Sequence, residues 1–205
     1  MDTKHRILDE ALTLFSQKGY ASVYVGEIAE RVGIKAPSLY KHYKNKKAIF
    51  DAIIDEMNQR YLEQVNILNI NGMDPSEDIS RYMNISEDDF IQIGTSLFLH
   101  FLHDDYTSRF RKILTIEQFH NLEFAKLYSD EYVDGPLKYQ KMLFQLLVSN
   151  GVFVDADIDV ITLQFYSPIF MLLTLCDREP SREDEAVQLL EKHFRQFSAI
   201  YGRNK

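Results

Sequence analysis

Three groups of side chains in this sequence have the types and spacing that chemistry requires. Glu117 and His120 have the Glu-x-x-His spacing of helical di-iron sites, but that chemistry needs a second such pair, and we find none. His100 and His103 are three residues apart and could meet on one helix face, yet no third metal ligand accompanies them. The third group is a run of lysines, tyrosines and a serine after Gly33, which suits contacts with phosphate.

Other kinds of enzyme chemistry find no support in the sequence. The chain has no phosphate-cradling glycine loop and no credible nucleophile constellation, so we expect no catalytic residue, metal or cofactor. Its single cysteine, Cys176, lies in an apolar stretch and excludes an internal disulfide and any multi-cysteine zinc site. We therefore expect a protein that is not an enzyme and that works in a reducing cytoplasm.

The elements that must position these groups are helices. The 205 residues are 45% hydrophobic and 26% charged, and eight Gly and five Pro leave long stretches free of helix breakers. Asp74 and Pro75 open a connection, whereas the pairs Ser86 with Asp89 and Ser181 with Asp184 have capping-box spacing. We expect an all-α fold of about nine or ten helices. The predicted ranges are 2–18, a short helix from about Val25 ending at Gly33, a third helix opened by Pro37, 46–69, 87–103, 106–130, 136–150, 157–176 with a bend at Pro168, and 182–201.

Two stretches bear on targeting. Residues 1–15 mix charged and apolar positions at helical spacing and lack the unbroken apolar segment of a secretory signal. The most apolar stretch, residues 165–176, has twelve residues and is too short to span a bilayer. The sequence therefore predicts a soluble, cytoplasmic protein without a membrane partner.

Charge is distributed unequally along the chain. The net charge of −8 argues at first against a protein that binds polyanions. Residues 1–50, however, contain nine Lys or Arg and five acidic residues, whereas the other 155 residues contain 14 basic and 26 acidic ones. This division predicts two functions on one chain.

Within the basic segment, two short helices joined at Gly33 match the helix-turn-helix plan, over about residues 23–42. The run from Gly33 to Phe50, GIKAPSLYKHYKNKKAIF, strongly resembles the recognition helix and following helix of the tetracycline repressor (TetR) family. Upstream, residues 7–15, 18–20 and 28–29 resemble the rest of its N-terminal domain. The resemblance covers about 55 residues and implies a three-helix DNA-binding domain over residues 1–60.

The resemblance also implies roles for individual residues. Ala36, Pro37 and Ser38 would face bases, Tyr40 and Lys46 would contact phosphates, and His42 would contact phosphate or pack. Charge and position add Lys35 and Lys41. The second helix of the family commonly opens with Thr or Ser, whereas Val23 and Tyr24 stand here, so either Ser22 caps one residue early or the Tyr24 hydroxyl contacts phosphate. Leu39 and Tyr43 are expected in the core. The DNA-binding candidates are therefore Tyr24, Lys35, Ala36, Pro37, Ser38, Tyr40, Lys41, His42 and Lys46.

Residues 61–205 would form a helical ligand-binding and dimerisation domain, as the resemblance implies. The last two helices would pair across a two-fold axis, and the abundance of apolar residues in both fits such an interface. An apolar cavity among the aromatic residues would hold a small-molecule effector, and the acidic composition favours a neutral or cationic one. The pocket candidates are His100, His103, Phe119, His120, Tyr128 and Tyr166.

Together these observations predict a DNA-binding transcriptional regulator. The expected form is a homodimeric repressor that binds a near-palindromic operator and is released by a small molecule. The alternative is a helical metal-binding protein or enzyme that retains a helix-turn-helix. Failure to select any sequence from random DNA would favour that alternative.

Overall fold

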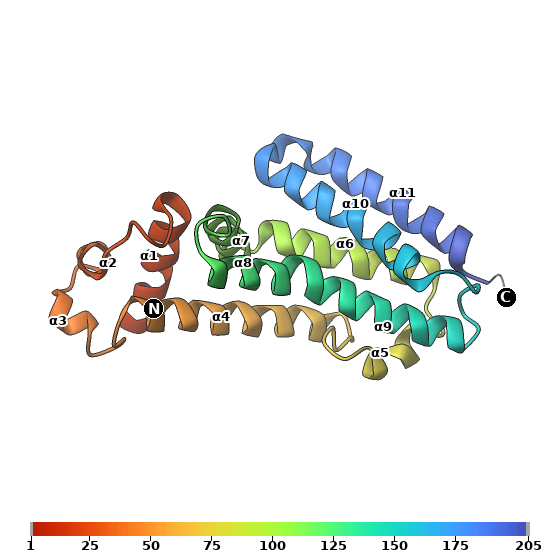
Figure 1. Cartoon of the computed structure of the whole chain (residues 1–205), viewed down its shortest axis with the longest axis horizontal. Helices are drawn as coiled ribbons and strands as arrows, with labels where there is room; N and C mark the ends of the chain where they lie inside the picture. The colour runs from red at the N-terminus through yellow and green to blue at the C-terminus, as the bar shows by residue number, and fades with distance from the viewer. Residues whose placement is uncertain (1, 204–205) are drawn as a thin grey trace. The chain divides into compact units, whose positions relative to one another are not determined.

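The structure, a computed structural model, describes residues 2–203, and within that range it is helical without a β-strand (Figure 1). An isolated bridge joins Phe153 and Gly202. The predicted all-α class is confirmed. The helices are α1 (Thr3–Lys18), α2 (Val25–Val32), α3 (Ala36–Leu39), α4 (Lys46–Ile67), α5 (Pro75–Tyr82), α6 (Glu87–His103), α7 (Asp105–Glu117), α8 (Leu122–Ser129), the π-helix η1 (Asp130–Asp134), α9 (Gly135–Ser149), α10 (Ile158–Arg178), the 3₁₀-helix η2 (Pro180–Arg182) and α11 (Glu183–Tyr201).

These helices form two compact units. Unit 1 runs to Tyr61 and resumes over Asp105–Tyr128, so it contains α7 and α8 as well as the N-terminal helices. Unit 2 comprises Leu62–Asp104 and the chain from Ser129 onward. The functional division between residues 60 and 61 stays a prediction.

The core of unit 1 is built on aromatic rings. The apolar face predicted for α1 is buried, and its last member, Phe15, lies 5.0 Å from the ring of Tyr20. Phe50 of α4 lies 5.9 Å from Phe110 of α7 and 4.9 Å from Phe124 of α8, measured between ring centroids. Rings from four helices and the loop after α1 therefore share one cluster, which anchors α7 and α8 to the N-terminal helices.

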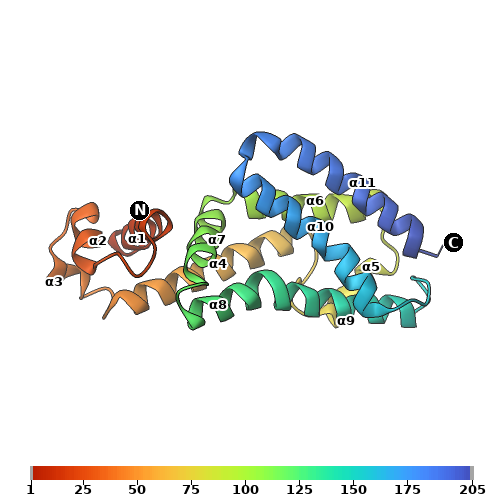
Figure 2. The same ribbon diagram turned by 45° about the horizontal axis from the view of Figure 1, so that its top comes forward.

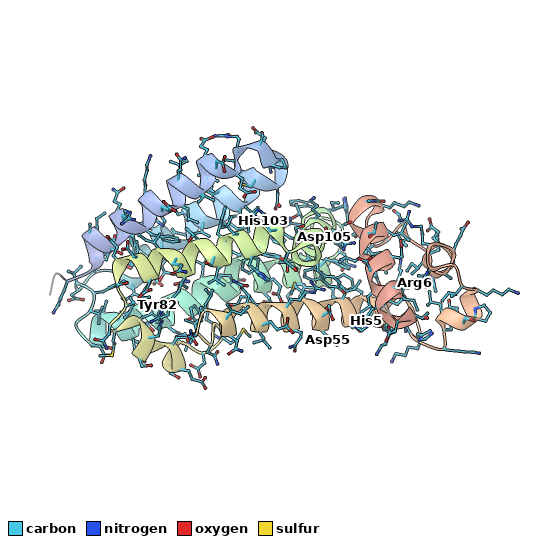
Figure 3. All side chains as sticks on the ribbon, turned by 180° about the vertical axis from the view of Figure 1, so that it is seen from behind. His5, Arg6, Asp55, Tyr82, His103 and Asp105 are labelled. Carbon is cyan, nitrogen blue, oxygen red and sulfur yellow. The ribbon has the colours of Figure 1, made fainter. Side chains whose placement is uncertain are left out.

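Two arginines add polar ties within unit 1. Arg109 of α7, whose side chain is 18% exposed, donates to Asp9 Oδ1 at 2.8 Å and to Thr13 Oγ1 at 2.6 Å, both on α1. Arg6 of α1, labelled in Figure 3, donates from its guanidinium to the carbonyl of Val32 at the end of α2, at 2.6 Å. The second contact satisfies one of the carbonyls that the C-terminal end of α2 leaves without a partner inside the helix.

Unit 2 has a second aromatic core, formed by α6, α9, α10 and α11. The ring of Phe165 on α10 lies 5.2 Å from Phe144 on α9 and 4.9 Å from Phe197 on α11. Figure 2 shows α10 and α11 side by side. Gly94 on α6 faces Phe194 so closely that a Cβ atom at this position would lie 2.3 Å from the ring. The absence of a side chain at Gly94 therefore lets α6 and α11 approach each other.

A buried carboxylate joins α5 to α9. Asp78 is 2% exposed, and its Oδ2 atom accepts hydrogen bonds from the Gly72 N–H at 2.8 Å and from the Tyr139 hydroxyl at 2.6 Å. The Asn71 N–H donates to its other oxygen. These three donors satisfy a charge that would be costly to bury alone.

A π-helix interrupts the helical run between α8 and α9. In the wider turn of η1 the carbonyl of Tyr132 accepts a hydrogen bond from the Tyr166 hydroxyl at 2.8 Å. A Cβ atom on Gly135 would lie 2.1 Å from the Asp130 carbonyl oxygen, so only glycine fits where α9 begins.

Three helix predictions need correction. The stretch opened by Asp74 and Pro75 is the helix α5, because Asp74 caps it through the Ser76 N–H and Pro75 occupies its first turn. The helix predicted over 106–130 is divided at residues 118–121 into α7 and α8. α11 begins at Glu183 after η2, and no Ser181 cap forms. By contrast, Ser86 caps α6 as predicted, through the Asp89 N–H at 3.1 Å.

The helix α10 is longer than its most apolar stretch indicates. Its 21 residues include an 18-residue window of mean hydropathy 1.6, so by length and composition it could cross a membrane. The apolar stretch of twelve residues, 165–176, underestimates the apolar length of this helix, because the helix also includes the turns before Phe165, with Ile158 and Ile161. A core helix of a soluble protein meets the same criterion, and one face of α10 packs within unit 2.

Candidate nucleic-acid interface

The turn between α2 and α3 has the geometry of a helix-turn-helix. Gly33 has φ +76°, and the Ile34 N–H donates to the Ala29 carbonyl at 2.9 Å, which closes the C-terminus of α2. Pro37 lies in the first turn of α3, as predicted. The buried side chains of Val32 and Leu39 pack the two helices into the core of unit 1. One side of α3 thus packs on the core of unit 1 through Leu39, while its other side faces solvent.

The exposed side of α3 carries the predicted DNA-contacting residues. Tyr40 is 52% exposed, Lys35, Pro37, Lys41 and His42 are exposed, and Ala36 and Ser38 are partly exposed. Leu39 and Tyr43 are buried, which confirms that they belong to the core. Seven candidates on α3 and its two flanks are therefore exposed or partly exposed, while their contacts with DNA stay predictions.

Positive charge is left uncompensated at this surface. Lys18 pairs with Glu27, Arg31 with Glu10, and Lys47 with Asp51 and Glu123. Within residues 2–203, in contrast, the exposed lysines at 35, 41 and 44 form no ion pair. These three exposed cations thus lie at and after α3, where a phosphate backbone would neutralise them.

The start of α2 differs from the predicted Ser22 cap, whereas the predicted contact of Tyr24 with phosphate stays a prediction. Tyr24 is its N-cap residue and is 74% exposed. The Tyr24 N–H donates to Glu27 Oε2 at 2.9 Å, so a carboxylate in the first turn satisfies the helix start, and Ser22 does not cap it. The Tyr24 hydroxyl stays available to a phosphate.

Lys46, a predicted phosphate contact, has its ammonium engaged within unit 1. Its Nζ donates to the carbonyls of Tyr20 at 2.8 Å, Ala21 at 3.3 Å and Val23 at 2.9 Å, and lies 4.4 Å from the centroid of the Tyr20 ring. Burial lowers the pKa of Lys46, although nearby carboxylates act in the opposite direction. An ammonium has three N–H donors, and three carbonyls surround this one.

The six pocket candidates are divided between the units. Phe119, His120 and Tyr128 belong to unit 1, where Phe119 is 82% exposed. In unit 2, the exposed His103 lies 2.9 Å from Glu183 Oε1, and Tyr166 donates to the carbonyl of Tyr132. The pocket therefore stays a prediction, and neither unit contains all six residues.

The Glu-x-x-His pair does not converge. No group of three or more His, Cys, Asp or Glu side chains in the described range is placed to hold a metal ion. His120 is exposed, whereas Glu117 is 5% exposed and lies against the loop after α1, with Oε1 accepting from the Ala21 N–H at 3.4 Å. No pattern in the sequence indicates this contact, because the two residues are 96 positions apart.

Several known proteins are similar to this chain. Residues 7–53 match the family of bacterial regulatory proteins, tetR family. The HTH-type transcriptional regulator AcrR of Shigella flexneri is 31% identical over 126 residues, which are 60% of this chain and 51% of AcrR. The negative regulator IcaR of the biofilm operon icaADBC in Staphylococcus aureus (strain Newman) is 39% identical over 75 residues, 37% of this chain and 40% of IcaR. The chain thus spans about half the length, or less, of the curated relatives it matches.

Solved structures share the fold along the whole chain. SmeT, the repressor of the Stenotrophomonas maltophilia multidrug efflux pump SmeDEF, has a TM-score of 0.64 at 18% identity, with 100% of this chain and 92% of that chain covered. A complex of SmeT with triclosan gives a TM-score of 0.66 at 17% identity, covering 100% and 93% of the two chains. At these identities the likeness establishes the fold alone.

Proposed function

Since this chain belongs to the TetR family of bacterial regulatory proteins, we propose that it is a homodimeric transcriptional repressor that binds a near-palindromic operator and is released by a small molecule. It acts in the bacterial cytoplasm and carries no catalytic centre. Residues 1–60 contact DNA, and residues 61–205 bind the effector and form the dimer.

The observation that carries this proposal is the exposed side of α3. Ala36, Pro37 and Ser38 are at the N-terminal end of a helix held by a buried Leu39, and unpaired lysines flank them. A recognition helix contacts base edges through its N-terminal residues while cations around it hold phosphates. This arrangement supports sequence-selective binding in the major groove.

Dimerisation is supported by the exposed apolar faces of the last two helices. Val160, Leu163 and Met171 are exposed on α10, and at 100° per residue they lie within one face. Leu189 and Ile200 are exposed together on α11. Exposed apolar residues that share one helix face favour an interface, and a two-fold pairing buries the same faces on both subunits.

Release by an effector follows from the operator spacing. The two recognition helices must be about 34 to 36 Å apart, or a multiple of that distance, to enter successive major grooves. α4 is continuous across the boundary between the units, so an effector bound in residues 61–205 can move the DNA-binding domain through it. The effector shifts the population only by its differential affinity for the two spacings. SmeT, which shares the fold, has been solved in complex with triclosan, and this supports a small molecule as the effector.

Selection from a random pool of duplex DNA by the full-length protein tests the function. We expect a near-palindromic sequence to be enriched. It should bind the protein at least about a thousandfold more tightly than unselected DNA does. Enrichment of no sequence would contradict the proposal and favour the alternative of a helical protein that merely retains a helix-turn-helix.

The variant Ser38→Ala tests the role of α3 in choosing the sequence. It should change the preference among variants of the selected duplex at one base position per half-site, by about fivefold. Ser149→Ala, an exposed change in unit 2, is the matched control and should leave both affinity and preference unchanged. An equal change on every duplex would remove Ser38 from the base-contacting residues.

A further inference from the structure

The loop between α1 and α2 determines where α2 begins, and two charged side chains hold it. It starts at Gly19, with φ +81°, and runs through Val23 to the N-cap residue Tyr24. Most of its side chains are small, and Ala21 and Ser22 are exposed, so packing alone fixes it only at the buried Val23 and at the ring of Tyr20. Its backbone therefore needs other partners to adopt a single conformation.

Lys46 holds the loop from the side of α4. Its ammonium is within hydrogen-bond distance of three carbonyls of the loop, those of residues 20, 21 and 23, and contacts the face of the Tyr20 ring. The ring in turn packs on Phe50 and Phe124, with centroids 5.2 and 5.1 Å apart. One side chain at the first position of α4 thus gathers carbonyls that would otherwise point in different directions.

Glu117 holds the same loop from the side of α7. Its buried Oε1 accepts from the Ala21 N–H, and a Cβ atom added to Gly19 would lie 2.7 Å from that oxygen. Lys46 and Glu117 also attract each other electrostatically. The loop backbone therefore has a cation at its carbonyls and an anion at its amide.

We propose that Lys46 and Glu117 are positioning residues that hold the Gly19–Val23 loop between them and thereby fix the N-terminus of α2 and Tyr24 for DNA binding. This inference rests on the proposed function. Lys46 then acts through the loop rather than as a phosphate contact. Glu117 is outside residues 7–53, which match the family, so α7 supplies part of the DNA-binding domain.

Lys46→Met separates these two roles, since it removes the ammonium and keeps an unbranched chain over the Tyr20 ring. A lost phosphate contact lowers the slope of log affinity against log salt by about 0.9 per contact, whereas a misplaced loop lowers affinity with the slope unchanged. We expect about tenfold weaker binding to the selected duplex, because charge-assisted hydrogen bonds are lost, and an unchanged slope. Lys44→Met is the matched control, because it removes the same charge from an exposed side chain two residues away. It should flatten the slope.

Amide hydrogen exchange of the free protein supplies the second measurement. Lys46→Met and Glu117→Ala should both accelerate exchange in residues 20–27 by about tenfold or more, and should leave α9 unchanged. Lys46→Arg keeps the positive charge and N–H donors and should restore most of the protection and affinity. Lys44→Met should not change exchange in this segment.

The outcomes separate the two proposals. A flattened salt slope for Lys46→Met with unchanged exchange in residues 20–27 would overturn the positioning role and restore the phosphate contact. Unchanged amide exchange of residues 20–27 in Glu117→Ala would show that Glu117 is not a positioning residue. If the unmodified protein selects no DNA, the proposed function fails, while the exchange data still decide whether the two residues hold the loop.

Discussion

Replacement of Gly94 by alanine should test how closely α6 and α11 are packed. A Cβ atom at this position would lie 2.3 Å from Cε2 and 2.5 Å from Cζ of Phe194. Phe194 is fully buried, with ring centroids 5.6 Å from both Phe90 and Phe165, so its ring has no free space to enter. We expect Gly94→Ala to lower the free energy of unfolding of unit 2.

The magnitude follows from two opposing terms. An ordinary carbon–carbon contact needs about 3.5 Å or more, so the helices or the ring must move by about 1 Å. Overpacking of this kind costs about 1 to 3 kcal/mol. Alanine returns about 1 kcal/mol as the better helix former. We therefore expect a net loss of up to about 2 kcal/mol, and a stability about 1 to 3 kcal/mol below that of a glycine-to-alanine change at an open helical position.

Urea unfolding followed by circular dichroism measures this loss. Gly26→Ala is the matched control, because nothing lies within 4 Å of its added Cβ atom, and it should leave stability unchanged or raise it slightly. Phe194→Leu should make room for the new methyl group, so the double variant should be about 1 kcal/mol more stable than the sum of the single effects. Strict additivity, or a Gly94→Ala protein that gains as much stability as Gly26→Ala, would refute the packing argument.

Arg109→Met should lower the free energy of unfolding by about 2 kcal/mol, because charged hydrogen bonds between α7 and α1 are lost, whereas Arg31→Met breaks an exposed pair and should cost less than about 1 kcal/mol in the same urea titration. Equal losses of stability in Arg109→Met and Arg31→Met would count against a stabilising role of the Arg109 hydrogen bonds. Asp78→Asn places an amide N–H, a donor, against N–H and O–H groups that also donate, and it should lower the free energy of unfolding by about 2 kcal/mol or more. Tyr139→Phe removes one of these donors and should lower it by about 1 kcal/mol. A larger loss for Tyr139→Phe than for Asp78→Asn would contradict this account. Burial, aided by nearby carboxylates, raises the pKa of Tyr43 to about 12, above its unfolded value near 10. The neutral form of the Tyr43 hydroxyl is therefore favoured by folding, so its contribution to the free energy of unfolding is complete below a pH of about 10 and is lost as pH rises toward 12. In urea titrations across this pH range, Tyr43→Phe should flatten the decline in stability.

Local signals in the sequence determined much of the fold. α2 and α3 were predicted because Gly33 and Pro37 each suit one backbone position, and α6 was predicted because Ser86 caps it. α5 was missed because an eight-residue helix with few apolar residues has little periodicity. The break between α7 and α8 contains neither Gly nor Pro, and the Asn121 side chain, which accepts from the Glu123 N–H, starts the second helix there.

The candidate interface also has a part that could be predicted from the sequence and a part that could not. Exposure of Lys35, Pro37 and Tyr40 follows from the period of one helix and could be predicted. The partners of Lys46 are 23 to 26 residues away, and the partner of Glu117 is 96 residues away. A pattern within one helix contains no information about such pairings, since tertiary packing creates them.

The construction of α3 has a consequence for the evolution of this protein. A four-residue helix is too short to be stable alone, and here Leu39 is its only buried residue. The exposed positions around it contribute little to the core, so most substitutions there should change stability by less than about 0.5 kcal/mol. Under the proposed function, substitutions at Lys35, Ser38 and Tyr40 can therefore change the DNA target without first compensating for a loss of stability. Duplicated copies of such a gene can then diverge in target while they keep one fold.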